Sequence, residues 1–126
     1  MKHKDLTGVV IGCAFKVHNT LGIGFLEKVY ENALYIELAK HKLRVQQQTP
    51  ITVYYEGEPV GEYFADLLVE DNVIVELKAV RDLRKEHEVQ LVNYLTATGI
   101  DTGLLINFGP SVQVKRKYRQ YSAGSQ

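Results

Sequence analysis

The chain has 126 residues and a mass of 14.3 kDa, a length that predicts a single domain rather than two domains. Hydrophobic residues make up 45% and charged residues 24%, a balance that excludes a disordered chain and a membrane protein. No apolar run approaches the roughly 20 residues of a membrane-spanning helix, and no signal peptide is recognisable, so we expect a cytoplasmic protein without a membrane partner. The single cysteine, Cys13, excludes an intrachain disulfide and a cysteine-rich zinc site.

Charge is distributed unevenly although the net charge is zero. Residues 1–44 carry seven basic and four acidic side chains, and residues 78–126 carry eight basic and four acidic ones. Residues 45–77 between them carry seven acidic side chains and no basic one. An acidic middle with basic flanks is what a cation site with anion-binding edges would need. Chance in a small protein explains the pattern equally well, so both readings stay open here.

Two helices are expected before any strand. Residues 5–21 carry apolar side chains at helical spacing, which predicts a core-facing helix in which Cys13 is a buried small hydrophobe and not a nucleophile. After the break at Gly22-Ile-Gly24, a second helix is expected over residues 25–42. Its predicted buried stripe consists of Leu26, Val29, Tyr30, Ala33, Leu34 and Leu38.

A β region follows, interrupted by one helix. Alternating and apolar runs predict strands at residues 51–55, 60–69, 73–79, 102–107 and 112–118, and a third helix at residues 84–98. Pro50 suggests an edge strand or a strand start. The order ααβββαβ(β) predicts an α/β fold, a mixed β-sheet flanked by helices, in which the third helix crosses over to a parallel strand. We expect this single domain to cover residues 1–121, followed by a flexible tail at residues 122–126.

Ionisable residues lie on two strands that should be buried. Asp66 belongs to one strand, and Glu76 and Lys78 share one face of the next. If the turn between these strands is the three residues 70–72, with Asn72 in the left-handed conformation, Asp66 lies directly across from Glu76. A two-residue turn would place Asp66 opposite Leu77 and separate the two acids.

Two adjacent carboxylates repel each other unless a proton or a cation lies between them. Carboxylate oxygens favour Mg²⁺ or Mn²⁺, and a lysine two residues later could hold a water or a developing negative charge beside the metal. The alternative is a buried ion pair of Lys78 with Glu76 or Asp66 and no catalysis.

The arrangement of Asp66, Glu76 and Lys78 resembles the motif of the PD-(D/E)XK nuclease superfamily. Asp66 followed by Glu76-Leu77-Lys78 is similar to its central motif, and Gly24-Phe-Leu-Glu27-Lys-Val-Tyr30 is similar to the signature of its small GxxExxY branch. Gln90-Leu-Val-Asn-Tyr94 resembles the Gln-xxx-Tyr motif of RecB-like nucleases. The resemblance implies a restriction-endonuclease-like core. One departure is Ala65, where the motif often has proline.

The resemblance also implies roles for single residues. Asp66, Glu76 and the carbonyl group of Leu77 would ligate Mg²⁺ or Mn²⁺, with Glu27 binding directly or through water. Lys78 would orient the attacking water and stabilise charge in the transition state, and Gln90 would position Lys78 or a phosphate, with Tyr94 one turn away. The products would carry 5′-phosphate and 3′-hydroxyl ends.

Plainer readings of the same helical residues stay open. Glu27 would be a solvated acid beside a core aromatic, Tyr30, and Gln90 and Tyr94 would form a hydrogen bond on the helix surface. His87 fits a helix-face residue better than a metal ligand.

The expected partner is nucleic acid, DNA rather than RNA. Candidate phosphate contacts are Arg81, Arg84, Lys85, Lys115, Arg116, Lys117 and Arg119, although such clusters are also ordinary solvated surface. The alternative function is a non-catalytic nucleic-acid-binding or assembly module that keeps the nuclease fold. A homodimer is expected from the aromatic β region, which contains Tyr54, Tyr55, Tyr63 and Phe64.

Overall fold

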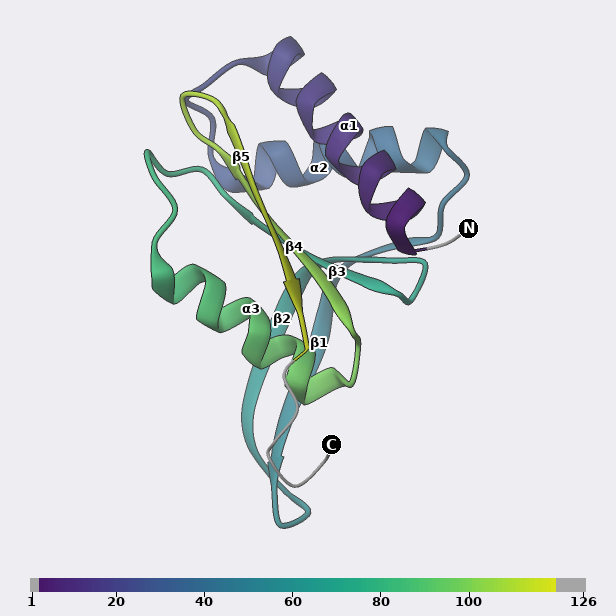
Figure 1. Ribbon diagram of the computed structural model, residues 1–126, viewed down its shortest axis with the longest axis vertical. Coiled ribbons are helices and arrows are strands. Elements are labelled where there is room, and N and C mark those ends of the chain that lie inside the picture. The colour runs from purple at the N-terminus through teal and green to yellow at the C-terminus, as the bar shows by residue number, and fades with distance from the viewer. Residues whose placement is uncertain (1–2, 120–126) are drawn as a thin grey trace.

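The computed structural model describes residues 3–119 (Figure 1). The tail expected at residues 122–126 lies outside these described residues. In chain order the elements are α1 (His3–Leu21), α2 (Glu27–Lys40), β1 (Val45–Tyr55), β2 (Glu58–Val69), β3 (Val73–Lys78), α3 (Lys85–Thr98), β4 (Thr102–Phe108) and β5 (Val112–Tyr118). Among the described residues, no helix combines the length and the hydropathy needed to cross a membrane.

The five strands form one mixed sheet whose spatial order follows the sequence, β1-β2-β3-β4-β5. Neighbouring strands are antiparallel except β3 and β4, which are parallel and are joined through α3. A parallel pair needs such a crossover because its second strand must start again at the same end of the sheet. The predicted fold class and the predicted crossover are therefore confirmed.

Helices cover both faces of the sheet (Figure 1). One core lies between the sheet and α1 with α2, and contains buried side chains such as Val10, Leu34, Val75 and Ile106. A smaller core lies under α3; its buried members are Ile51, Ala65, Ile74, Leu91, Tyr94, Leu95 and Leu105. Cys13 is 5% exposed and belongs to the first core, as predicted for a small hydrophobe.

The prediction for the second helix was partly wrong. Leu26 is extended, with φ −70° and ψ 155°, so α2 begins at Glu27 and not at residue 25, and it ends at Lys40. Leu26 is 81% exposed and Val29 38% exposed, although both were expected in the buried stripe. Glu31 is buried instead, at 4% exposure. Amide side chains from β1 hydrogen-bond its carboxylate, which lets a charged residue occupy an inward-facing position.

The first strand begins at Val45, six residues earlier than the apolar pattern predicted. Its first half is rich in glutamine, a composition that β1 tolerates because it is an edge strand. Pro50 lies in this edge strand, as expected for a residue that cannot donate to a ladder.

The pairing of β1 with β2 is interrupted at one level. Gln47 pairs with Leu67 and Thr49 pairs with Ala65, but Gln48 and Asp66 between them do not pair. Gln48 has a φ of +53°. Ala65 packs in the core under α3, whereas Leu67, two residues later, packs under α1 and α2. Alternate residues of a regular strand share a face. Strand β2 must therefore be irregular at Asp66, because its side chains change from one face of the sheet to the other there.

Candidate active site

Asp66 and Glu76 lie where β2 and β3 separate. The turn between the strands is the three residues 70–72, and Val69 pairs with Val73, so the register is the one that brings the two acids together. The left-handed residues of this turn are Glu70 and Asp71, with φ of +53° and +55°, and not Asn72 as predicted.

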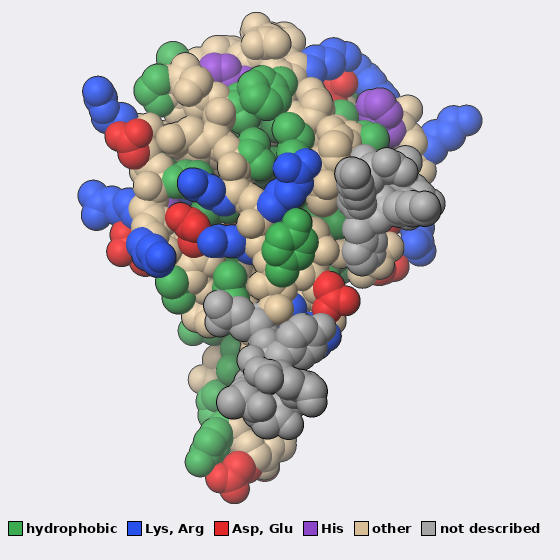
Figure 2. Space-filling model, viewed as in Figure 1, with side chains coloured by type: hydrophobic (Ala, Val, Ile, Leu, Met, Phe, Trp, Pro, Cys, Tyr) green, Lys and Arg blue, Asp and Glu red, His purple; other side chains and the backbone are tan. Residues whose placement is uncertain are grey.

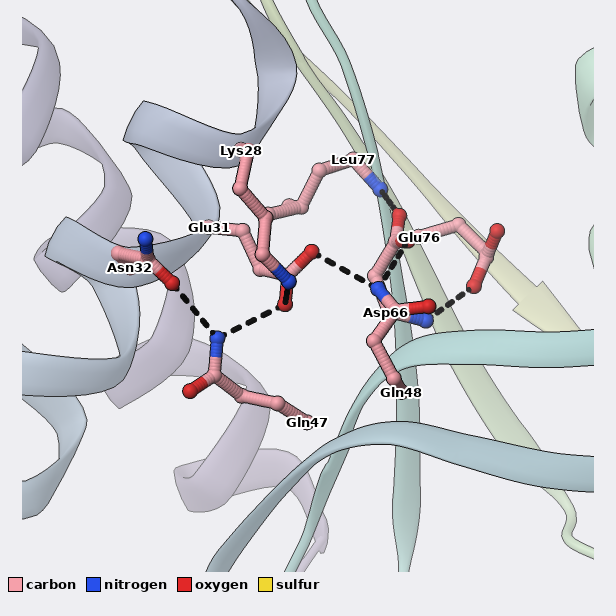
Figure 3. Close-up of polar contacts among 8 residues, drawn as sticks. All are labelled: Lys28, Glu31, Asn32, Gln47, Gln48, Asp66, Glu76 and Leu77. Carbon is pink, nitrogen blue, oxygen red and sulfur yellow. Dashed lines mark hydrogen bonds and ion pairs between the residues drawn. The ribbon is translucent and has the colours of Figure 1, made fainter.

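Side chains replace the regular ladder at this level. Beyond the pair Leu67–Val75, the backbone N–H of Asp66 donates to Glu76 Oε2 at 2.8 Å. The N–H of Leu77 donates to Asp66 Oδ2 at 2.7 Å. Each carboxylate is thus fixed by the backbone of the opposite strand (Figure 3).

The environment of this pair is unfavourable for negative charge. Burial, followed by the neighbouring Asp66 charge, raises the pKa of Glu76 to about 8. Burial also raises the pKa of Asp66, against the lowering effect of the Leu77 N–H. Two acids whose charge is under-compensated are a place where a cation would be stabilising.

Lys78 supplies positive charge close to three acids. It lies two residues after Glu76 on β3, is half-buried, and lowers the pKa values of Glu27, Asp66 and Glu76 through its charge. Among the described residues no ion pair within 4.0 Å involves Lys78. A closed Lys78–Glu76 or Lys78–Asp66 ion pair, the plainer reading of this spacing, is therefore not formed.

Asn107 fixes the chain just beyond Lys78. It is fully buried, and its side-chain amide accepts from the Val80 N–H at 2.9 Å and donates to the Val80 carbonyl at 2.8 Å. The backbone of Gly109 lies so close to the same carbonyl that a Cβ at this position would be 2.5 Å from its oxygen. Sequence reasoning missed this clamp, whose only signal was a lone asparagine in an apolar strand.

Glu27 is exposed in the first turn of α2. Burial raises its pKa, while the Lys78 charge lowers it and the Asp66 charge raises it, so Glu27 lies on the same side as the acid pair. Within residues 3–119, however, no three Asp, Glu, His or Cys side chains are close enough to form a metal-binding group. Glu27 therefore approaches the pair without completing a ligand set with it.

The Tyr30 residue of the Gly24-to-Tyr30 motif is structural. It is fully buried and stacks on Phe108, with ring centroids 4.6 Å apart. Its hydroxyl donates to the Gly22 carbonyl at 2.6 Å and accepts from the Phe25 N–H at 3.3 Å. Gly24 has a φ of +111°, a conformation that other residues rarely adopt. The motif thus holds the loop that places Glu27 at the start of α2.

Glu31 and Gln48 connect α2 to Asp66, and sequence reasoning missed both. Glu31 Oε1 accepts from Gln48 Nε2 at 2.9 Å, and Oε2 accepts from Gln47 Nε2 at 2.8 Å and pairs with Lys28 Nζ at 3.0 Å (Figure 3). Gln48 Nε2 also reaches Asp66 Oδ1 at 3.3 Å. The available signals were the i, i+4 spacing of Glu31 from Glu27 and a run of three glutamines.

Gln90 and Tyr94 lie on α3, on the sheet side opposite α2. Tyr94 is 6% exposed, and burial, with Glu76 as the next cause, raises its pKa to about 12. No hydrogen bond joins Gln90 to Lys78 or to Tyr94 among the described residues, so the predicted positioning role of Gln90 stays a prediction. His87 accepts a hydrogen bond from the Arg84 N–H at 3.0 Å, which is a helix-capping role and not a ligand role.

The candidate phosphate contacts are spread over the surface. Arg81 lies beside a hollow of about 370 Å³ next to Gly24 and Phe25. Lys117 pairs with Glu88 at 2.7 Å, and Arg119 pairs with Asp101 at 3.0 Å. The other candidates, Arg84, Lys85, Lys115 and Arg116, are exposed. Basic and acidic side chains lie intermixed on the face shown in Figure 2.

The family model of the PD-(D/E)XK nuclease superfamily matches residues 4–120, nearly the whole chain. The chain belongs to the PD-(D/E)XK nuclease superfamily. Membership supports an enzyme of nuclease type. A comparison with curated proteins gave no match.

Two solved structures share the fold. One is described as the crystal structure of SSO0001; it has a TM-score of 0.60 and 16% identity over 78% of this chain and 53% of that one. The other is an alkaline exonuclease, LHK-Exo, from Laribacter hongkongensis, with a TM-score of 0.53 and 15% identity over 74% of this chain and 55% of that one. The chain spans about half the length of either structure. At these identities the likeness concerns the fold.

Proposed function

We propose that this chain is a divalent-metal-dependent nuclease of the GxxExxY branch, which hydrolyses phosphodiester bonds of nucleic acid, DNA rather than RNA. The observation that carries the proposal is the cross-strand pair of Asp66 and Glu76, each held by the backbone of the opposite strand. The Lys78 charge acts on both acids, and Lys78 forms no ion pair within 4.0 Å in the described part of the chain. Burying two acids side by side destabilises the folded state unless the acids bind a cation. A purely structural role would therefore not account for the pair.

The residues present fit a hard divalent cation. Asp66 and Glu76 supply carboxylate oxygens and the Leu77 carbonyl is adjacent, while Glu27, which does not form a three-acid group with them, would have to move or act through water to add a ligand. The raised pKa values show that the ionised forms of both acids are disfavoured in the metal-free site, and a Mg²⁺ or Mn²⁺ ion would stabilise these ionised forms. Such an ion supplies Lewis acidity and lowers the pKa of a bound water.

Lys78 provides what the carboxylates cannot. Its ammonium group, not held in an ion pair, is available to orient the attacking water or to stabilise the negative charge that develops on the phosphoryl oxygens. The Asn107 clamp on Val80 fixes the backbone two residues later, which limits how far Lys78 can move. Of the basic candidates, Arg81 follows this strand most closely and is the first phosphate contact we would assign.

Cleavage of a mixed panel of single-stranded, double-stranded and branched nucleic acids tests the proposal. Wild-type protein is expected to cut at least one substrate with Mg²⁺ or Mn²⁺ and none with EDTA. Asp66→Asn keeps the side-chain shape but removes the charge, and is expected to abolish cleavage. Glu62→Gln, the same kind of change at an exposed residue of β2, is the matched surface control and should cut normally. A folded wild-type protein that leaves every substrate intact would favour the non-catalytic binding or assembly module.

A further inference from the structure

A groove of about 720 Å³ lies between α3 and the ribbon formed by β1 and β2. Its walls include Tyr54 and Tyr63 from the ribbon and Glu86, Gln90, Asn93 and Tyr94 from α3. No Lys or Arg of the described chain lines it. Three tyrosines and three aliphatic residues make its lining mainly apolar, with two amides, a threonine and one acid.

The groove exists because the ribbon extends past the rest of the sheet. Pairing of β2 with β3 ends at Leu67–Val75, whereas β1 and β2 continue to pair out to Tyr55–Glu58, forming the arm at the bottom of Figure 1. A register shift between Val53 and Tyr54 breaks the alternation of β1, so both residues face the groove. Figure 2 shows the arm protruding from the body, with hydrophobic side chains along it and an acidic one near its tip.

The chemistry of the lining suits nucleobases and not phosphates. The rings of Tyr63 and Tyr94 lie 5.7 Å apart at 44°, and Tyr54 and Tyr63 remain 64% and 46% exposed. Open aromatic rings stack on bases of any sequence, and amides such as Gln90 and Asn93 can hydrogen-bond base edges. A duplex would present phosphates, for which this groove offers an acid, Glu86, and no cation.

Tyr94 of α3 borders both the groove and the surroundings of the acid pair. Gln90 and Tyr94 line the groove, and Tyr94 lies close enough to Glu76 and Asp66 for their charges to raise its pKa.

We propose that this groove takes up unpaired bases of a single-stranded nucleic acid, stacked on Tyr54 and Tyr63. The inference rests on the proposed nuclease function for the fate of the bound strand, but the binding itself requires neither metal nor cleavage. It assigns single-stranded nucleic acid, or the single-stranded end of a duplex, as the preferred substrate class.

Equilibrium binding in EDTA tests the inference without cleavage. The probes are a fluorescent oligothymidylate of about 10 nucleotides, an abasic oligonucleotide of equal length and charge, and a blunt duplex, followed by fluorescence anisotropy. Wild-type protein should bind the oligothymidylate tightest. Tyr54→Ala and Tyr63→Ala should each weaken that binding by about 5- to 100-fold, the loss of one base-stacking contact. Tyr63→Phe keeps the ring and should bind like wild type.

Phe64→Ala is the matched control. Phe64 neighbours Tyr63 on the same ribbon and is 54% exposed, but it does not line the groove, so its removal should leave binding unchanged. Equal binding of base-bearing and abasic strands, preference for the duplex, or an equal loss in Phe64→Ala would overturn the inference. So would a change of oligomeric state in Tyr54→Ala or Tyr63→Ala, which would assign the groove to a second copy of the chain. Tyrosine-dependent binding without metal-dependent cleavage would instead uphold the groove and reject the proposed nuclease.

Discussion

Glu76 carries a carboxyl group that is 4% exposed and lies beside a second acid, Asp66. The loss of hydration and the neighbouring charge both raise the pKa of Glu76, and the Asp66 N–H and the Lys78 charge oppose them. The pair is thus a source of instability in the metal-free protein. Such a cost is typical of a site that is built for a ligand.

A pH dependence of stability follows for the metal-free protein. The pKa of Glu76 is about 8 in the folded chain, compared with a usual value of 4.5, so the folded state holds this proton more tightly. Stability should therefore fall as pH rises from about 4.5 through about 8. Melting temperatures in EDTA at intervals across this range measure the effect. Glu76→Gln, which cannot ionise, should flatten the dependence; the same slope in wild type and variant would show that another group is responsible.

Substitution of Lys78 distinguishes a catalytic role of this residue from a structural one. If it stabilises the transition state, Lys78→Ala should lower the cleavage rate by about 10²–10³-fold, equivalent to about 2.7–4 kcal/mol, while the fold and metal binding persist. If it only neutralises Asp66 and Glu76, the variant should instead lose about 3–5 kcal/mol of stability, and added divalent metal should restore it. Cleavage assays and melting curves with and without Mg²⁺ distinguish the two. A variant that cuts at the wild-type rate would remove Lys78 from the mechanism.

At the scale of elements, the site depends on an irregular strand pair. The β1–β2 ladder is interrupted at Gln48 and Asp66, and the β2–β3 ladder stops at Leu67, so Asp66 is freed from pairing on both sides. The Gln48 side chain then bridges Glu31 of α2 to Asp66. The helix α2 and the strands β1 and β2 are thereby linked by hydrogen bonds at the Asp66 carboxylate.

Gln48→Gly tests this bridge with little backbone cost, because a φ of +53° is a conformation that glycine adopts freely. The variant should stay folded but hold Asp66 less firmly, and we expect its cleavage rate to fall by about 10-fold. Gln46→Ala is the control, since Gln46 is an exposed residue of the same strand whose side chain accepts a hydrogen bond from the Thr49 hydroxyl. Normal cleavage by Gln48→Gly would mean that the two backbone donors suffice to hold the acid pair.

The same elements show how much of the fold and of the site could be predicted from the sequence. The order of helices and strands, the parallel crossover and the approach of Asp66 to Glu76 follow from hydrophobic periodicity and the length of one turn. Periodicity could not show that Leu26 is exposed, because the start of α2 is set by Gly24 and by the buried Tyr30 hydroxyl. Glu31, Gln48 and Asn107 were missed because each is a single polar residue whose contacts come from other elements.

At the scale of the whole molecule, the surface carries apolar side chains that a small monomer would leave in water. Ile23, Phe25 and Leu26 are 62%, 48% and 81% exposed, and the ribbon adds Tyr55 and Phe64. Burying about 1,200–2,000 Å² in total would suffice for a specific interface. A homodimer therefore stays our prediction, and its interface should leave the groove open.

Light scattering at tens of micromolar should give twice the chain mass, and Leu26→Ser should shift the mass toward the monomer, since Leu26 is a large apolar side chain that is 81% exposed. Tyr54→Ala, which alters only the groove, should remain a dimer. A monomer mass for the wild-type chain would contradict the prediction.

The central claim is that Asp66 and Glu76 form a divalent-cation site, and isothermal titration of the metal-free protein with Mn²⁺ or Mg²⁺ tests it most directly. The account predicts saturable binding to the wild-type chain and its loss in both Asp66→Asn and Glu76→Gln. A parallel thermal shift should stabilise only the wild type, by about 2.7 kcal/mol at a hundred times the dissociation constant. No binding at millimolar metal, or equal binding by wild type and Asp66→Asn, would contradict the account.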